Sequence, residues 1–516
     1  MFDAAVVSMT VTITQVAEAF AMHEIGVSVS SGLRSGPSSG PSDLAPLPRA
    51  PVDLAPATPL STALPGHGAG TTLVPLSNTA ALGTGGGLSG SPSTGRPSGS
   101  GTTHGVGPQQ LVPGQVADPT QLAALTGLDL LLQLSLLPNA EIADFIAQNP
   151  ASVTTLLGAQ PGARAVQLWW ADLSMESRGA MLSSAPQLVG NLEGVPFNIR
   201  DRANRRLLAS SMTSLETGSD ATTGRSATVD AERELHMLDQ ITLALGTATG
   251  AEPRTLISFD PAGAGTASIV IGDVASADFV TFLVPGMFYT ADTQMVEWTA
   301  SAQSLHDVQT EWIEKLADRD SRFVDATVAT VSWIGYETPS LVNFTSLDLA
   351  YGGRDAIARA VGGLREIRGD DQPFVSVIAH SYGSTATMMA LRDYGMQLDS
   401  LGIVGSPGSG AKRATELGVP GDNVFVGEAH WDQVKDSAFF GADPGSTSFG
   451  AHQISVDGGL DSLTGATLLG STGHDEYFVR GSESLRNLAL VALGQGALVS
   501  SDRAAAFYKT ASIGER

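Results

Sequence analysis

The chain has 516 residues, enough for more than one domain, and a core of roughly 250 residues would bury ample apolar surface. Its 28 basic residues face 52 acidic ones, and the net charge of −24 argues against nucleic acids and anionic membrane surfaces as partners. The absence of cysteine excludes disulfides, thiolate metal sites and a cysteine nucleophile.

The N-terminal quarter of the chain shows no pattern of a folded core. Residues 1–27 fit one short helix, but no basic region precedes their apolar stretch, and Glu18 and Glu24 interrupt it, so a signal peptide is not expected. Residues 28–118 are rich in Gly, Pro, Ser, Thr and Ala and are predicted to be a disordered linker. No run of about 18 apolar residues occurs, so no membrane span is expected. The compartment stays open, with the cytoplasm slightly favoured over export.

A helical region that packs on the core is predicted for residues 119–250. Leucine and alanine recur there at helical spacing, and prolines and glycines separate the segments. The predicted helices cover residues 119–137, 140–148, 163–173, 177–184, 198–210 and 230–245. A polar gap is expected between residues 213 and 228, with Asp230 as the N-cap of the helix that follows.

Residues 251–516 are predicted to form the catalytic domain, because strand-like runs alternate with helical ones. Several strands are apolar throughout, as buried parallel strands are. The predicted strands cover residues 256–259, 267–271, 279–284, 326–333, 374–378, 401–404 and 424–426. An apolar stripe along residues 295–316 indicates a helix packed on the sheet. The alternation predicts a doubly wound, mostly parallel sheet with helices on both faces.

A tight turn between a strand and a helix carries the candidate nucleophile. Residues 374–380 are an apolar run, Ser381 follows, and a helical pattern extends to Leu391. Small residues two before and two after the serine, Ala379 and Gly383, let strand and helix approach closely, as in a nucleophile elbow. The alternative is that Ser381 only caps the helix. The flanking strand and helix favour the elbow and hence an α/β-hydrolase fold.

A serine nucleophile needs a base, and three histidines follow it in the chain. His474 is preferred because it lies in a polar turn after a short apolar run, where a loop could carry it to the elbow. His452 is the reserve candidate. His430 is less favoured because it lies beside the candidate acid.

Two aspartates compete for the role of the carboxylate that orients the imidazole. Asp432 follows a predicted strand, at the position where this fold places the acid. Asp443 lies in an Asp-Pro-Gly sequence, which is typical of a turn. Asp432 is therefore the preferred acid and Asp443 the alternative.

An oxyanion hole requires two backbone N–H donors. Tyr382, which follows the nucleophile, supplies the first, and the loop after residues 279–284 should supply the second. Gly286 suits a backbone that turns towards a ligand, and the donor is Met287 or Phe288, with Met287 preferred. No metal or organic cofactor is implied by this set.

Three groups of motifs together resemble one family, the actinobacterial α/β-hydrolase domain family of unassigned function found in large predicted esterase-like or lipase-like proteins. They are residues 189–204; residues 283–287 and 333–339 with the elbow; and residues 405–410, 432–434, 441–444 and 473–478. The resemblance covers roughly residues 165–495 and implies Ser381, Asp432 and His474 as the triad. The chain departs from the family at Ala379, where glycine is usual, and at Phe288, because a smaller residue usually follows the methionine at this place. Phe288 is expected to narrow the oxyanion region.

These features predict a serine hydrolase that cleaves a small-molecule carboxylic ester through an acyl-enzyme intermediate. Two alternatives stay open: an amidase or peptidase with the same triad, and a catalytically idle, envelope-associated binding module that keeps the elbow for structural reasons. No protein partner is indicated by the sequence.

Overall fold

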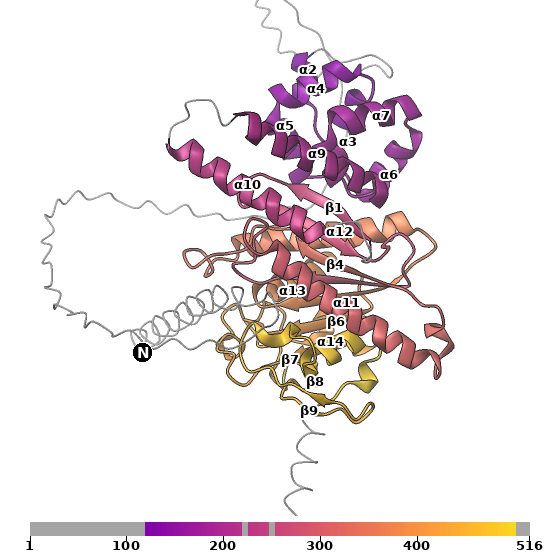
Figure 1. Ribbon diagram of the computed structural model, residues 1–516, viewed down its shortest axis with the longest axis vertical. Coiled ribbons are helices and arrows are strands. Elements are labelled where there is room, and N and C mark those ends of the chain that lie inside the picture. Colours follow the sequence, from indigo (N-terminus) through magenta and orange to yellow (C-terminus); the bar gives the residue numbers. More distant parts are fainter. Residues whose placement is uncertain (1–118, 219–224, 247–252, 502–516) are drawn as a thin grey trace, which may run out of the picture. The chain divides into compact units, whose positions relative to one another are not determined.

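The computed structural model describes residues 119–218, 225–246 and 253–501 (Figure 1). The predicted N-terminal helix and the predicted linker, residues 1–27 and 28–118, lie outside the described residues. None of the helices in the described part of the chain combines the length and apolar character needed to cross a membrane.

An eight-stranded sheet is the centre of residues 253–501. Its strands lie in the spatial order β1 (Arg254–Asp260), β2 (Thr266–Ile271), β4 (Val328–Ile334), β3 (Phe279–Val284), β5 (Phe374–His380), β6 (Ser400–Val404), β7 (Val424–Gly427) and β8 (His452–Ile454). The pairs β1–β2 and β2–β4 are antiparallel, and the other neighbouring pairs are parallel. The predicted mostly parallel sheet is confirmed, and β8 is an additional short edge strand that the sequence pattern did not reveal.

Helices cover both faces of the sheet, as predicted. Helices α11 (Met295–Ala317) and α14 (Glu483–Ala492) pack on one face, and α12 (Asp348–Arg368) and α13 (Tyr382–Tyr394) pack on the other. Strand β3 shows the reason. Its Phe279 and Leu283 belong to the hydrophobic core under α11 and α14, whereas Val280 and Phe282 belong to the core under α12 and α13. Successive side chains of a strand point to opposite faces, so an apolar strand needs a cover on both sides.

The region before the sheet is helical, with corrections to the predicted boundaries. Its helices are α2 (Pro119–Ala124), α3 (Gly127–Leu134), α4 (Asn139–Gln148), α5 (Pro150–Gly158), α6 (Ala163–Asp172), α7 (Met175–Ser184), α8 (Pro186–Asn191), α9 (Phe197–Gly218) and α10 (Arg225–Leu245). Helices α5 and α8 were missed because each begins with a proline, which the sequence analysis treated as a break. Proline is tolerated in a first turn, where its missing N–H has no intrahelical partner to lose.

Helices α9 and α10 extend into the predicted polar gap. The prediction that Asp230 caps the second helix is wrong, because α10 begins at Arg225 and Asp230 lies inside it. Where the side chains of this stretch are described, Thr213, Ser214, Glu216 and Thr217 are exposed on α9, and Asp230 is exposed on α10. The polar composition of these residues therefore indicates the solvent-exposed face of a helix and not the end of a helix.

Short elements complete residues 253–501. They are the hairpin of β9 (Gly459–Leu460) and β10 (Thr467–Leu468), and the 3₁₀ turns η1 (Ser321–Phe323), η2 (Ala414–Leu417), η3 (Pro420–Asp422), η4 (Lys435–Ser437), η5 (Glu476–Phe478) and η6 (Gly496–Leu498).

Polar side chains from α8 and α9 pair with the outer edge of β1. Asn191 donates from Nδ2 to the carbonyl of Phe259 at 2.8 Å and accepts the N–H of the same residue at 2.9 Å. The N–H of Leu256 donates to Asp201 at 2.7 Å, and Asn204 donates to the carbonyl of Leu256 at 3.0 Å. These contacts satisfy backbone groups that an edge strand would otherwise expose to pairing with another chain. The passage 189–204, noted above as one of the family motifs, thus closes the sheet edge.

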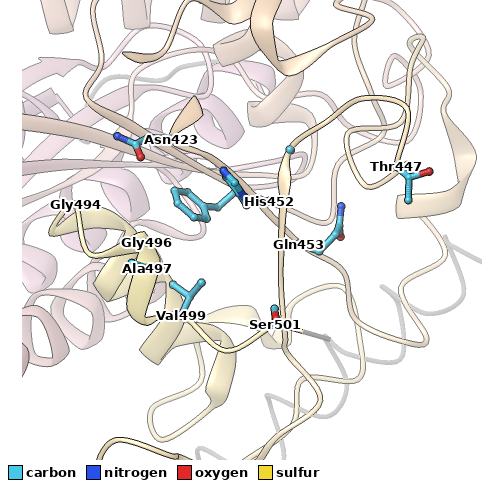
Figure 2. A pocket seen from close by; sticks show the side chains of 11 residues that line it. Asn423, Thr447, His452, Gln453, Gly494, Gly496, Ala497, Val499 and Ser501 are labelled. Atoms are coloured by element: carbon cyan, nitrogen blue, oxygen red, sulfur yellow. The ribbon is translucent and has the colours of Figure 1, made fainter. Parts of the chain in front are cut away.

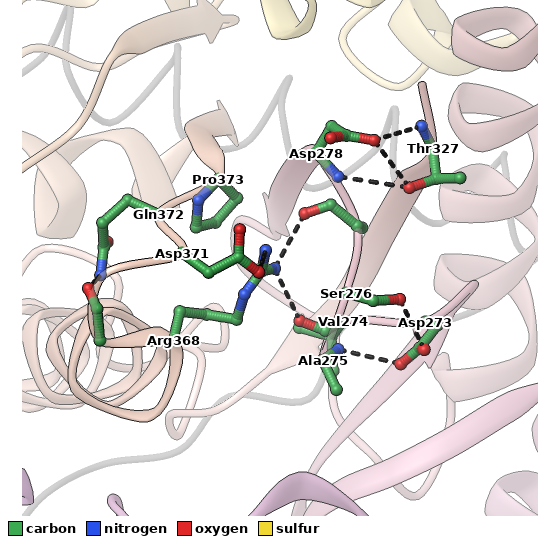
Figure 3. Close-up of polar contacts among 12 residues, drawn as sticks. Asp273, Val274, Ala275, Ser276, Asp278, Thr327, Arg368, Asp371, Gln372 and Pro373 are labelled. Atoms are coloured by element: carbon green, nitrogen blue, oxygen red, sulfur yellow. Dashed lines mark hydrogen bonds and ion pairs between the residues drawn. The ribbon is translucent and has the colours of Figure 1, made fainter. Parts of the chain in front are cut away.

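The segment just before β3 is anchored by the C-terminal end of α12 (Figure 3). Near the end of that helix, Arg368 donates to the carbonyls of Val274 and Ala277 at 3.3 and 2.8 Å and pairs with Asp371 at 2.9 Å. Asp278 then accepts both the N–H and the hydroxyl of Thr327, at 2.8 and 3.0 Å. These contacts fix the start of β3 and leave the carboxyl ends of the strands for the site.

Removing the side-chain amide of Asn204 should destabilise the fold. Asn204 is fully buried and donates to the carbonyls of both Gly190 and Leu256. We expect Asn204→Ala to lower the free energy of unfolding by about 1–3 kcal/mol, because two buried carbonyls lose their donor. Urea unfolding followed by circular dichroism measures this. Asn139→Ala, at an exposed position, should change the free energy of unfolding by less than about 0.5 kcal/mol. Equal effects of the two substitutions would contradict the role of Asn204 in holding the edge of β1.

Candidate active site

Ser381 lies between the last residue of β5 and the first residue of α13. Its φ of 53° and ψ of −131° are rare for a residue other than glycine, and such strain is found at functional sites. The side chain of the serine makes no capping hydrogen bond to its helix. The interpretation of Ser381 as a mere helix cap is therefore not supported, and its hydroxyl points elsewhere.

Glycines make room for this turn. A Cβ at Gly383 would overlap the carbonyl oxygen of Pro285, and a Cβ at Gly286 would overlap the Cβ of Ser381 and lie 2.8 Å from its Oγ. Ala379 is fully buried. The loop after β3 can therefore approach the serine closely only because these positions carry small or no side chains.

The structure brings Ser381, His474 and Asp432 together. Nε2 of His474 lies 2.9 Å from Oγ of Ser381, and Nδ1 lies 2.9 Å from Oδ1 of Asp432. The imidazole thus joins the hydroxyl to the carboxylate, although the serine precedes the histidine by 93 positions. Such an arrangement can accept a proton from the serine hydroxyl and stabilise the resulting imidazolium.

The carboxylate of Asp432 is buried and fully engaged. Its Oδ2 accepts the hydroxyl of Tyr477 at 2.6 Å, and its Oδ1 also accepts the N–H of Val434 at 2.9 Å. Tyr477 in turn accepts the N–H of Ala429 at 2.9 Å. A Cβ at Gly405 would lie 2.8 Å from Oδ2 of Asp432, so this position also has no space for a side chain.

Electrostatics favour a charged Asp432 beside a basic His474. Burial would raise the pKa of Asp432, but the charge and hydrogen bond of His474, with the other donors, lower that pKa to about 2. Burial would lower the pKa of His474, whereas the charge of Asp432 and its hydrogen bond raise it overall. Burial and then the charge of Asp432 hold the pKa of the Tyr477 phenol well above its usual range, so Tyr477 remains a donor.

The other sequence candidates lie elsewhere. Asp443 accepts the N–H of Gly445 at 2.8 Å, which is the turn contact that its sequence indicated. His452 is exposed on β8, where the centroid of its ring lies 5.2 Å from that of Phe425. It lines a cavity of about 890 Å³ (Figure 2), and the lining of this cavity does not include Ser381, Asp432 or His474. His430 is exposed, and its ring lies beside that of Trp431.

Two backbone amides near Ser381 remain candidates for the oxyanion hole. Tyr382 is the first residue of α13, where a helix leaves its N–H groups without intrahelical partners. In the loop after β3, the N–H of Phe288 donates to the carbonyl of Pro339 at 3.0 Å, so that N–H is already engaged. This favours Met287 over Phe288 as the second donor. The side chain of Tyr382 donates to the carbonyl of Ser346 at 2.6 Å and so ties a further loop to the site.

One group of side chains has the residue types of a metal site. His380, His474 and Asp475 place possible ligand atoms within 4.8 Å of one another. However, the ring nitrogens of His474 already contact Asp432 and Ser381. A metal ion bound through His474 would compete with those contacts.

Tyr477 is a site residue that the sequence analysis did not identify. It lies three positions after His474, in η5, inside one of the quoted motifs. A tyrosine near a candidate histidine carries no specific signal, and only the fold shows that its hydroxyl reaches Asp432. Spacing alone could not have assigned this contact.

Comparisons with known proteins agree with the fold. A family model described as Alpha/beta hydrolase matches residues 260–442, a segment that contains Ser381 and Asp432 and ends before His474. Two Mycobacterium tuberculosis proteins, Uncharacterized protein MT2140 (strain CDC 1551 / Oshkosh) and Uncharacterized protein Rv2079 (strain ATCC 25618 / H37Rv), are each 26% identical over 389 residues. The match covers 66% of this chain and 57% of each relative, so the chain spans little more than half the length of these curated relatives. The resemblance described from the sequence is confirmed.

Neutralising the carboxylate should change the titration of the imidazole. We expect Asp432→Asn to lower the pKa of His474 below its wild-type value, because the charge that opposes the effect of burial is lost. NMR titration of the imidazole carbon-bound protons measures this pKa. Asp443→Asn is the matched control and should leave it unchanged; a pKa that responds to Asp443 and not to Asp432 would contradict the pairing.

Proposed function

Since a family model described as Alpha/beta hydrolase matches residues 260–442, we propose that this chain is a serine hydrolase that cleaves carboxylic esters. The observation that carries the proposal is the hydrogen-bonded series from Ser381 through His474 to Asp432, with both donor–acceptor distances at 2.9 Å. The match to the family model supports hydrolase chemistry in general, and the geometry of Ser381, His474 and Asp432 supports the serine mechanism.

In the proposed reaction, Oγ of Ser381 attacks the ester carbonyl carbon while Nε2 of His474 takes the hydroxyl proton. The imidazolium is stabilised by Asp432, whose own position Tyr477 maintains. The tetrahedral oxyanion is held by the N–H groups of Tyr382 and Met287. Collapse of this intermediate releases the alcohol, which takes the proton from His474, and leaves the acyl group on the serine.

Deacylation repeats the same steps with water. His474 removes a proton from the water, which attacks the acyl carbonyl carbon, and then returns the proton to Oγ of Ser381 as the acid departs. The raised pKa of His474 suits this alternation, because the base must hold the proton between the two half-steps. No cofactor takes part in this scheme.

The first test is the hydrolysis of p-nitrophenyl esters from short to long acyl chains, with the matching p-nitroanilides. We expect wild type to hydrolyse esters and Ser381→Ala and His474→Ala to lose at least about 10³-fold in kcat. Faster cleavage of anilides than of esters would favour the amidase alternative. Absence of wild-type turnover, together with failure of a fluorophosphonate to label Ser381, would favour the idle module.

A second test concerns the approach of the β3 loop to the nucleophile. Gly286→Ala should lower kcat/KM by about 100-fold, because the added methyl overlaps Ser381 and displaces it from His474. Gly352→Ala, in α12 with no atom within 4 Å of the new Cβ, is the matched control and should retain wild-type activity. Both proteins should be compared at equal folded fraction by circular dichroism. An active Gly286→Ala enzyme would mean that the serine does not need this close approach.

A further inference from the structure

His380 is a buried histidine that the proposed reaction does not use. It is the last residue of β5, immediately before Ser381, and is 1% exposed. Its ring lies among aromatic side chains, with ring centroids between 5.9 and 6.5 Å away, from Tyr289, Trp298, Tyr477 and Phe478. A histidine is a costly choice for such an apolar position unless its polar atoms are needed.

One polar atom of this ring is engaged with the residue that would act as base. Nε2 of His380 lies 2.8 Å from the backbone oxygen of His474, and the two ring centroids are 4.6 Å apart. A carbonyl oxygen can only accept, so Nε2 carries the proton and donates it. Burial, and then the nearby charge of His474, lower the pKa of His380 to about 4, which keeps the ring neutral at neutral pH.

The residue held by this contact needs an anchor. His474 lies in a connection between β10 and η5 and has no regular secondary structure of its own. His380, by contrast, belongs to a central strand whose backbone pairs with both β3 and β6. Through its side chain, the residue before the nucleophile therefore holds the backbone of the base.

We propose that His380 is a positioning residue that holds the backbone of His474 through its Nε2–H and thereby keeps the imidazole of His474 within reach of Ser381. This inference rests on the proposed function, because it assigns His380 a role in the same reaction. The simple alternative is that His380 only fills space in the core. The two differ in one respect: positioning needs a donor of the correct reach, whereas packing needs only volume.

Two amide substitutions separate these roles. The side-chain nitrogen of glutamine reaches about as far as Nε2 of histidine, whereas that of asparagine is one methylene shorter and cannot reach the carbonyl of His474. We expect His380→Asn to lower kcat about 10- to 100-fold with little change in KM, because the base is misplaced and binding is not. His380→Gln should stay within about threefold of wild type.

The experiment measures ester hydrolysis, with rates normalised to sites titrated by a fluorophosphonate so that misfolded protein does not contribute. His452→Asn, at an exposed histidine on β8, is the matched control and should behave as wild type. If the His380→Asn protein does not fold, His380→Met, which fills similar volume without a donor, replaces it in the comparison with His380→Gln.

The outcomes are distinct. An active glutamine variant beside an impaired asparagine or methionine variant supports positioning. Equal activity of the variants, whether retained or lost, overturns it while leaving the serine hydrolase in place. A wild-type protein that neither turns over esters nor reacts with the fluorophosphonate overturns the proposed function, and the positioning role of His380 with it.

Discussion

The backbone conformation of Ser381 is the constraint on which the rest of the site depends. A positive φ at a residue other than glycine costs about 1–3 kcal/mol, so the surroundings must impose it. The N–H of Ser381 donates to the carbonyl of Val404 on β6 at 3.0 Å, and its carbonyl accepts the N–H of Ser384 in α13 at 3.0 Å. Strand and helix together thus fix the turn, and the hydroxyl projects beyond the sheet towards His474. The close approach of Gly286 and the place of the Tyr382 N–H at the start of α13 follow from the same turn.

The parts of this arrangement that could be predicted are those with a local sequence pattern. Strand β3 is apolar at nearly every position and was predicted with its observed bounds, because a strand covered on both faces cannot alternate. The elbow was recognisable because Ser381 stands between a strand pattern and a helix pattern. Only three histidines follow the serine, so chain order narrowed the choice of base before any geometry was available.

The parts that could not be predicted depend on contacts between distant segments. The hydroxyl of Tyr477 reaches Asp432 from 45 positions away, and the ring of His380 reaches the carbonyl of His474 from 94 positions away. Asn191 and Asn204 looked like ordinary polar residues of a helical region, although they pair with the open edge of β1. The helices that begin at Pro150 and Pro186 were missed for a different reason, since proline breaks a helix interior but suits a first turn.

The most direct test of the serine hydrolase is to look for the acyl-enzyme itself. Wild type, mixed with a p-nitrophenyl ester and quenched in acid within the first turnovers, would be digested and examined by mass spectrometry. We expect to find the acyl group on Ser381 of wild type and no acyl group on the Ser381→Ala protein. Ester hydrolysis without an adduct on Ser381, and undiminished in Ser381→Ala, would contradict the serine mechanism.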